Sequence, residues 1–249
     1  MSNLKVALQL YTMRNETARD FSGTIRRVAE LGYPGVEFAG YGGLSSQELV
    51  ALLAETGLQP VSTHVGLDAL QDDKLDDSIR YCKEIGCSFL VLPFLMPELR
   101  TPEAFQTLAP RLNVIGQRCR EQGITFAYHN HDFEFERIGD VYLMDHLLQA
   151  TDPDLVKLEV DVYWVAYAGL DPVSYLQKLG ERVVLLHLKD MEPDQSMTEV
   201  GKGTLNMKQI WGFAQARDLW GIVEQDYPKI PALESARISL AYFGITGKQ

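Results

Sequence analysis

The chain is poor in cysteine and in basic residues, and these shortages exclude several classes of protein. Only three of its 249 residues are cysteines, Cys82, Cys87 and Cys119, and none has the CxxC spacing of a zinc or thiol-redox motif. We expect all three to be reduced residues of the core or of helix faces. Lysine and arginine total 23 against 34 acidic residues, a net charge of −11. No nucleic-acid partner is expected, because phosphate-backbone binding requires clustered basic side chains.

Long apolar runs are also missing. No stretch reaches the roughly 18 apolar residues of a membrane span, so no membrane association is expected. The first residues, MSNLKVALQLY, lack the basic segment and apolar stretch of a targeting peptide. No linker rich in serine, proline or one charge interrupts the chain. We therefore expect one cytoplasmic domain over residues 1–249, a length typical of a single α/β barrel.

Eight short apolar runs alternate with amphipathic stretches along the chain. The runs occupy residues 4–10, 34–39, 58–64, 88–94, 124–131, 156–162, 183–189 and 219–225. Stretches with helical periodicity, several of them ending in glycine, occupy residues 21–32, 45–57, 74–86, 104–123, 145–150, 173–180, 207–218 and 231–244. Apolar strands that are each followed by a helix indicate a parallel sheet with a covered outer face. Eight such repeats favour a closed (β/α)₈ barrel of the α/β class over an open doubly wound sheet.

The few histidines fall where such a barrel carries its chemistry, at the C-terminal ends of the predicted strands. Four of the five lie there, namely His64, His129, His131 and His187, whereas His146 lies in a helical stretch and is expected at the surface. Carboxylates follow the same pattern at Glu37, Glu159, Asp161 and Glu224. Glu159 and Asp161 share a strand face, because side chains alternate with a period of two.

Carboxylates gathered at one mouth repel one another and need a cation, and a mixed nitrogen and oxygen donor set suits Mn²⁺, Co²⁺, Zn²⁺ or Mg²⁺. We predict one divalent ion held by Asp161, His187, Glu224 and one of His129 and His131, of which we take His129. Such an ion would stabilise an enediolate or enolate. Glu37, His64 and Glu159 are predicted to contact substrate, with Glu159 alternatively orienting a metal ligand from one layer deeper.

The segment YHNHDFEF, residues 128–135, offers more acid and base groups than one reaction needs. His131 and Glu134 are the predicted acid/base residues, and the sequence does not divide the roles between them. Lys189 in HLKD is predicted to bind an oxyanion, with Asp190 holding it in place, although a surface ion pair fits the same pattern. Trp164 is predicted to wall the substrate pocket.

The Gly-rich segment VGKGTLN, residues 200–206, lacks the strand and spacing of a phosphate-binding fingerprint. Its backbone amides could bind a substrate oxygen, or its glycines could simply turn the chain.

Together the motifs VALQLYTMR, YHNHDFEF, DVYWVAYAG, HLKD, VGKGTLN and IVEQD resemble the xylose isomerase-like barrel superfamily over nearly the whole chain. That superfamily includes sugar phosphate isomerases and epimerases, inosose isomerases and dehydratases, and AP endonucleases of the endonuclease IV type. The resemblance implies one metal held by Glu, Asp, His and Glu from successive strands. Asp161, His187 and Glu224 match the last three positions, but His129 stands where the first Glu is expected.

With His129 in place of this Glu, the chain departs from the pair of Glu residues that transfer the proton in the epimerases of the family. The YHNH segment is instead similar to that of the dehydratase-like branch. Likeness to the AP endonucleases is weaker, because Trp164 stands where a third-ion histidine would be needed. The resemblance implies a metal-dependent isomerase or epimerase acting on a small ketose, sugar phosphate or polyol. A dehydratase or lyase acting on a keto-sugar or inosose, and a non-catalytic sugar-binding barrel, are the alternatives. The sequence is compatible with a homo-oligomer.

Overall fold

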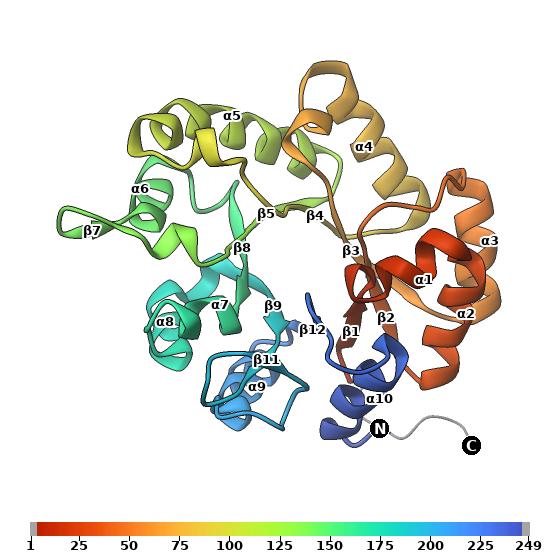
Figure 1. Ribbon diagram of the computed structural model, residues 1–249. Coiled ribbons are helices and arrows are strands. Elements are labelled where there is room, and N and C mark those ends of the chain that lie inside the picture. Colours follow the sequence, from red (N-terminus) through yellow and green to blue (C-terminus); the bar gives the residue numbers. More distant parts are fainter. Residues whose placement is uncertain (1–3, 246–249) are drawn as a thin grey trace.

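The computed structural model describes residues 4–245 and shows a closed barrel of eight parallel strands, the predicted architecture, seen end-on in Figure 1. Around the barrel the strand order is β1-β12-β9-β8-β5-β4-β3-β2, so neighbours in the chain are neighbours in space. The barrel strands are β1 (Val6–Gln9), β2 (Gly35–Phe38), β3 (Gln59–His64), β4 (Phe89–Leu92), β5 (Thr125–His129), β8 (Lys157–Asp161), β9 (Val183–Leu188) and β12 (Trp220–Val223). Each lies within one of the eight predicted apolar runs.

A ring of helices covers the outside of the barrel (Figure 1). The eight predicted helical stretches correspond to α2 (Phe21–Leu31), α3 (Ser46–Thr56), α4 (Asp72–Ile85), α5 (Pro102–Glu121), α6 (Leu143–Ala150), α8 (Pro172–Leu179), α9 (Met207–Ala216) and α10 (Ala232–Tyr242). Two short helices, α1 (Arg14–Arg19) and α7 (Val162–Tyr167), lack a predicted counterpart. Among the described residues, no helix is both long and apolar enough to cross a membrane.

Short elements decorate the loops between strands and helices. Two hairpins pair β6 (Arg137–Ile138) with β7 (Val141–Tyr142) and β10 (Asp190–Met191) with β11 (Met197–Thr198). Five 3₁₀ segments occur in the described part of the chain: η1 (Leu10–Met13), η2 (Leu67–Ala69), η3 (Pro97–Leu99), η4 (Phe133–Phe135) and η5 (Gly180–Arg182). The predicted fifth run, 124–131, is too long, since β5 ends at His129 and His131 lies in the loop beyond it.

Local sequence signals fix where the helices start and stop. The capping box of α3 is formed by Ser45 and Glu48, whose side chains each accept from the other residue's backbone N–H. The same helix ends at Gly57, which adopts φ 73°, a left-handed conformation that costs little without a Cβ.

All three cysteines are buried and free, as predicted.

Two apolar cores lie on the two sides of the barrel wall. The larger one packs the helices against the strands. The smaller one fills the barrel interior with Ala7, Val61, Val91, Ala127, Leu185 and Ile222. This inner layer matters for the site, because the residues two positions after Ala127, Leu185 and Ile222 point inward above it. Those residues are His129, His187 and Glu224.

Two helical glycines test this packing. A Cβ at Gly116 in α5 would overlap the backbone carbonyl of Leu155, whereas a Cβ at Gly212 in α9 meets nothing within 4 Å. We expect Gly116→Ala to lower the free energy of unfolding by about 1–3 kcal/mol through overpacking. The matched Gly212→Ala should raise it by up to about 1 kcal/mol, because alanine is the better helix former. Thermal unfolding measures both, and equal shifts for the two variants would contradict this packing.

Candidate functional site

The inward-facing polar residues form a layer at the C-terminal mouth of the barrel. They lie above the smaller apolar core of the barrel interior, which we call the apolar plug. In the strand register, His129 lies beside Glu159, and Asp161 lies beside His187. Because parallel strands end at the same edge, these side chains meet near the barrel axis. All four are at least 98% buried. The predicted convergence of strand-end residues is therefore what the structure shows.

One set of donors, which we call the mouth group, consists of His129, Asp161, His187 and Glu224. Each offers one ligand atom, and these atoms all lie within 4.8 Å of one another. The Nδ1 of His187 is 2.9 Å from Glu224 Oε2 and 3.9 Å from Asp161 Oδ2, and His129 Nε2 is 3.8 Å from the same Asp161 oxygen. These are the four residues predicted as metal ligands.

The backbone of α7 orients Asp161. Its Oδ1 accepts hydrogen bonds from the backbone N–H groups of Tyr163 (2.9 Å) and Trp164 (3.2 Å), as an N-cap residue does. Its own N–H donates to Asn130 Oδ1 at 3.0 Å. The cap leaves Oδ2 for the mouth group, where this buried oxygen lies 2.8 Å from the ammonium of Lys189. The unpredicted helix α7 thus has a role in aiming a predicted ligand.

A second set of donors, the deep group, lies next to the mouth group and shares two of its histidines. It consists of His64, His129, Glu159 and His187. Glu159 Oε2 lies 3.1 Å from His129 Nδ1 and 3.2 Å from His187 Nε2. Glu37 Oε1 lies 2.6 Å from the same His187 nitrogen. His129 and His187 therefore each face the mouth group with one ring nitrogen and a carboxylate of Glu159 or Glu37 with the other.

This two-sided geometry is that of a histidine whose second nitrogen is oriented by an acid while the first binds a metal. Glu37 and Glu159 are fully buried and are not among the residues that line the cavity described below. Their contacts thus fit orientation of His129 and His187, and their predicted contact with substrate stays a prediction. Burial opposes protonation of His64, but the charges of Glu37 and Glu159 raise the pKa of His64 to about 10.

Lys189 is fully buried and its ammonium contacts three carboxylates. Nζ lies 2.8 Å from Asp161 Oδ2, 2.6 Å from Glu224 Oε2 and 2.7 Å from Asp226 Oδ2. Burial would lower its pKa, but these three acids hold the pKa of Lys189 well above its usual value. Lys189 is therefore a positive charge held among three acids. It does not line the cavity described below, so its predicted binding of an oxyanion stays a prediction.

Asp190 does not hold Lys189 in place, contrary to the sequence-based interpretation. Its carboxylate instead accepts backbone N–H groups of Gly201 (3.0 Å) and Leu205 (3.1 Å). Two of the amides in the Gly-rich segment 200–206, which were candidates for binding a substrate oxygen, thus donate to Asp190, and the Thr204 N–H donates to the Met191 carbonyl. The partner of Lys189 beyond the mouth group is Asp226.

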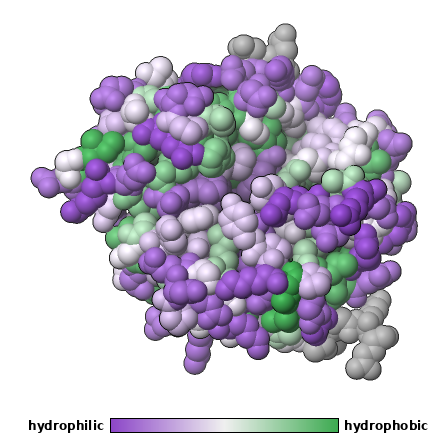
Figure 2. All heavy atoms as spheres, viewed as in Figure 1, coloured by the Kyte–Doolittle hydropathy of each residue, from purple (hydrophilic) through white to green (hydrophobic). Residues whose placement is uncertain are grey.

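A cavity of about 580 Å³ opens above the two groups. Its wall contains the aromatic residues Tyr11, Phe94, Trp164 and Tyr227, together with Ala39, Pro93, His64, His129, His131, Glu224 and Asp226. Among the described residues, no lysine or arginine lines it. On the face seen in Figure 2, apolar residues form separate patches among hydrophilic ones. The cavity thus combines aromatic walls with a polar, acidic floor.

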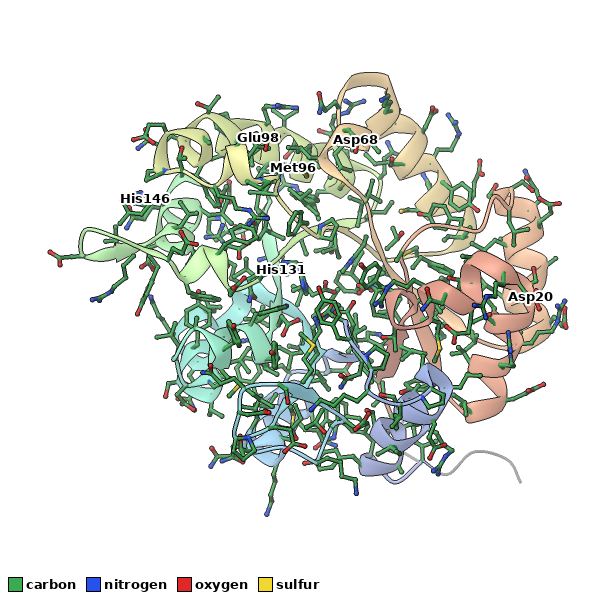
Figure 3. The ribbon with its side chains drawn as sticks, in the orientation of Figure 1. Asp20, Asp68, Met96, Glu98, His131 and His146 are labelled. Atoms are coloured by element: carbon green, nitrogen blue, oxygen red, sulfur yellow. The ribbon has the colours of Figure 1, made fainter. Side chains whose placement is uncertain are left out.

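His131 lies near the middle of the ring of helices in Figure 3, in contrast to His146, which lies out at α6. Its ring is 5.2 Å from that of Phe94 and 5.6 Å from that of Trp164, measured between centroids. No hydrogen bond to its buried Nδ1 is found within residues 4–245. Burial, and next the charge of Lys189, lower the pKa of His131 to about 3, so the ring is neutral. His131 is thus a neutral imidazole on the cavity wall.

Glu134, the other predicted acid/base residue, is placed differently. It is fully buried in η4, where Oε1 accepts from the Tyr128 hydroxyl (2.6 Å) and Oε2 from the backbone N–H of His131 (2.8 Å). Burial raises the pKa of Glu134 to about 8. The structure brings it neither to the cavity wall nor into the mouth or deep group. Its contacts fix the loop that carries His131.

The donor chemistry of the mouth group fits a divalent cation. Two carboxylates and two imidazoles converge, and their four ligand atoms lie within 4.8 Å of one another. Such an N₂O₂ donor set suits Mn²⁺, Co²⁺ or Zn²⁺. It suits Ca²⁺ less well, because Ca²⁺ prefers ligands that are all oxygen. The deep group then supplies the acids that orient both imidazoles.

Several residues of the site were not predicted. Gln9 ends β1, and its amide donates to Glu37 Oε1 at 2.6 Å. Asp226 follows Glu224 by two residues. Gln9 obeys the strand-end rule used for the histidines, so the sequence held a signal for it, whereas Asp226 lies in the loop beyond β12. The aromatic wall residues Tyr11, Phe94 and Tyr227 lie in loops and carry no such signal.

Comparison with known proteins agrees with this geometry. Residues 25–243 match the model of the xylose isomerase-like TIM barrel family. A solved structure of a sugar phosphate isomerase/epimerase from Parabacteroides distasonis superposes with a TM-score of 0.82 at 26% identity, covering 95% of this chain and 96% of that one.

Curated relatives carry the name inosose dehydratase. The protein from Geobacillus kaustophilus is 27% identical over 195 residues, which are 68% of this chain and 62% of the relative. The one from Lacticaseibacillus casei is 29% identical over 168 residues, 59% of this chain and 56% of the relative. The matched region thus spans about six tenths of the length of these relatives.

Replacing one acid at a time should weaken metal binding, and the size of the loss should depend on where the acid lies. We expect Asp161→Asn to weaken Mn²⁺ binding most, since asparagine keeps the cap of α7 but removes the charged ligand oxygen. Glu37→Gln and Glu159→Gln should weaken it by about 10–100-fold, the usual loss when a partner that orients a ligand is removed. Isothermal titration calorimetry measures all three.

Glu134→Gln is the matched control for this series, because it replaces another fully buried carboxylate near the mouth. We expect it to leave Mn²⁺ affinity unchanged. A loss as large as that of Asp161→Asn would place Glu134 among the ligands and contradict the mouth group as defined.

Proposed function

Because the chain belongs to the xylose isomerase-like TIM barrel family, we propose that it is a divalent-metal-dependent isomerase or epimerase of an unphosphorylated keto-sugar or related polyol. The observation that carries the proposal is the combination of the mouth group with an unpartnered histidine, His131, on the wall of one cavity. The names of its relatives support a sugar-processing enzyme.

The cavity lining favours an uncharged substrate. Its walls offer four aromatic rings, against which the apolar faces of a sugar ring pack. A phosphate group would meet the carboxylates of Glu224 and Asp226, with no arginine or lysine on the described cavity wall to receive it. A neutral ketose, cyclic keto-polyol or inosose avoids that repulsion.

His131 is the residue to which we assign removal of the proton next to the substrate carbonyl. It lines the cavity, and its ring is neutral, as a proton acceptor must be. A divalent ion held by the mouth group would act as a Lewis acid towards the negative charge that develops. Lys189 adds a fixed positive charge next to Asp161 and Glu224, and Trp164 holds the sugar face. His64 also lines the cavity, and we assign to it the return of the proton.

Elimination of water from the same enediolate is the second candidate reaction. The naming of the curated relatives as inosose dehydratases favours it. Both reactions start with the same proton abstraction and differ in whether a proton returns or a β-hydroxyl leaves.

Product analysis in heavy water tests the proposal. The Mn²⁺-loaded protein is incubated with a panel of unphosphorylated keto-sugars and inososes, with the phosphorylated ketoses as controls. We expect an isomer of the substrate that carries solvent deuterium next to the carbonyl, whereas a dehydratase gives a product lighter by one water. Metal binding with no exchange or turnover across the panel would contradict the proposal and favour a non-catalytic sugar-binding barrel.

His131→Gln should lower kcat by about 10²–10⁴-fold, the range for loss of a general base, while Mn²⁺ affinity stays unchanged. His146→Gln makes the same chemical change on the outer helix α6 and should leave kcat as it is. Steady-state kinetics and calorimetry on both variants check this. Full activity in His131→Gln would rule out His131 as the base.

A further inference from the structure

The positive charge of Lys189 lies beside the same carboxylates that would bind a metal ion in the mouth group. Its ammonium lies within 2.8 Å of Asp161 Oδ2 and Glu224 Oε2, the same oxygens that face His187 Nδ1. A divalent ion bound by these carboxylates would sit close to the positive charge of the Lys189 ammonium. Like charges at such short range repel strongly in a buried site. Metal binding therefore requires another partner for Lys189.

Asp226 is that partner. Its Oδ2 accepts a hydrogen bond from Lys189 Nζ at 2.7 Å, and it belongs to neither the mouth group nor the deep group. Of the three carboxylates on Lys189, it is thus the one that a mouth-group ion leaves available. It is also the most exposed of the three, with 15% of its side-chain surface accessible.

The chain around Asp226 is anchored from the first βα-loop. Arg14 Nη2 donates to the backbone carbonyl of Asp226 at 2.6 Å, and its guanidinium stacks 4.6 Å from the centre of the Tyr11 ring. The N–H of Gln225 donates to Thr12 Oγ1 at 3.0 Å. These contacts hold the Asp226 carboxylate beside Lys189.

We propose that Asp226 is a positioning residue that holds the Lys189 ammonium outside the mouth group, so that Asp161 and Glu224 can bind the divalent ion. The inference rests on the proposed function, because it concerns the same metal. It gives Asp226 a role that acts through Lys189, not through contact with the ion or the substrate.

A double-mutant cycle measured by calorimetry with Mn²⁺ as the probe tests this. Asp226→Asn should weaken Mn²⁺ binding at least about tenfold, the loss typical of a missing positioning partner, since Lys189 then pairs only with Asp161 and Glu224. Asp226→Glu keeps the charge and should stay within about threefold of the parent, well below that loss. In a Lys189→Met background no ammonium competes, and adding Asp226→Asn should change the affinity little.

Controls for net charge come from the opposite end of the barrel, where Lys5 pairs with Asp218. Lys5→Met and Asp218→Asn change the charge in the same way and should leave Mn²⁺ affinity unchanged. Should Asp226→Asn fail to fold, Asp226→Ser, which likewise removes the charge, takes its place in both backgrounds.

Equal weakening by Asp226→Asn with and without Lys189 would overturn the inference, because Asp226 would then act directly on the ion. Unchanged affinity in Asp226→Asn would overturn it as well. Absence of Mn²⁺ binding by the unaltered protein would overturn the proposed metal dependence and this inference together, whereas a non-coupled cycle in a protein that binds Mn²⁺ overturns the inference alone.

Discussion

Five carboxylates lie close together at the C-terminal mouth of the barrel, on Glu37, Glu159, Asp161, Glu224 and Asp226, and four of them are at least 96% buried. Desolvating that much negative charge is costly unless cations or hydrogen-bond donors accompany it. The chain supplies one lysine and a set of histidines shared between the acids. The rest of the site follows from how this excess of negative charge is compensated.

The barrel compensates this negative charge by arranging the groups around it in layers. An apolar plug closes the interior, the deep acids bind one nitrogen of His129 and of His187, and the other nitrogens face the mouth group. Each imidazole therefore connects an orienting acid to a position for a metal ion. The aromatic cavity lies above, so a substrate meets charged groups at its floor and ring faces at its walls.

The sequence predicted the barrel because its eight apolar runs and helical periods agree with one another. It also predicted the mouth group, because Asp161, His187 and Glu224 end strands that the fold must bring together. It predicted an acid/base role for Glu134, but a carboxylate three residues beyond His131 in a loop can turn outward or, as here, back to Tyr128. The interpretation of Asp190 was wrong for a similar reason: adjacency to Lys189 in the chain does not give contact, whereas Asp226, far along the chain, provides it.

The most direct test of this account is a crystal structure of the protein grown with Mn²⁺, with the ion located by its anomalous signal. We expect one strong peak bound by Asp161, His187 Nδ1, Glu224 and His129 Nε2, with Lys189 on Asp226. A peak between His64 and Glu159, or none at saturating Mn²⁺, would contradict it.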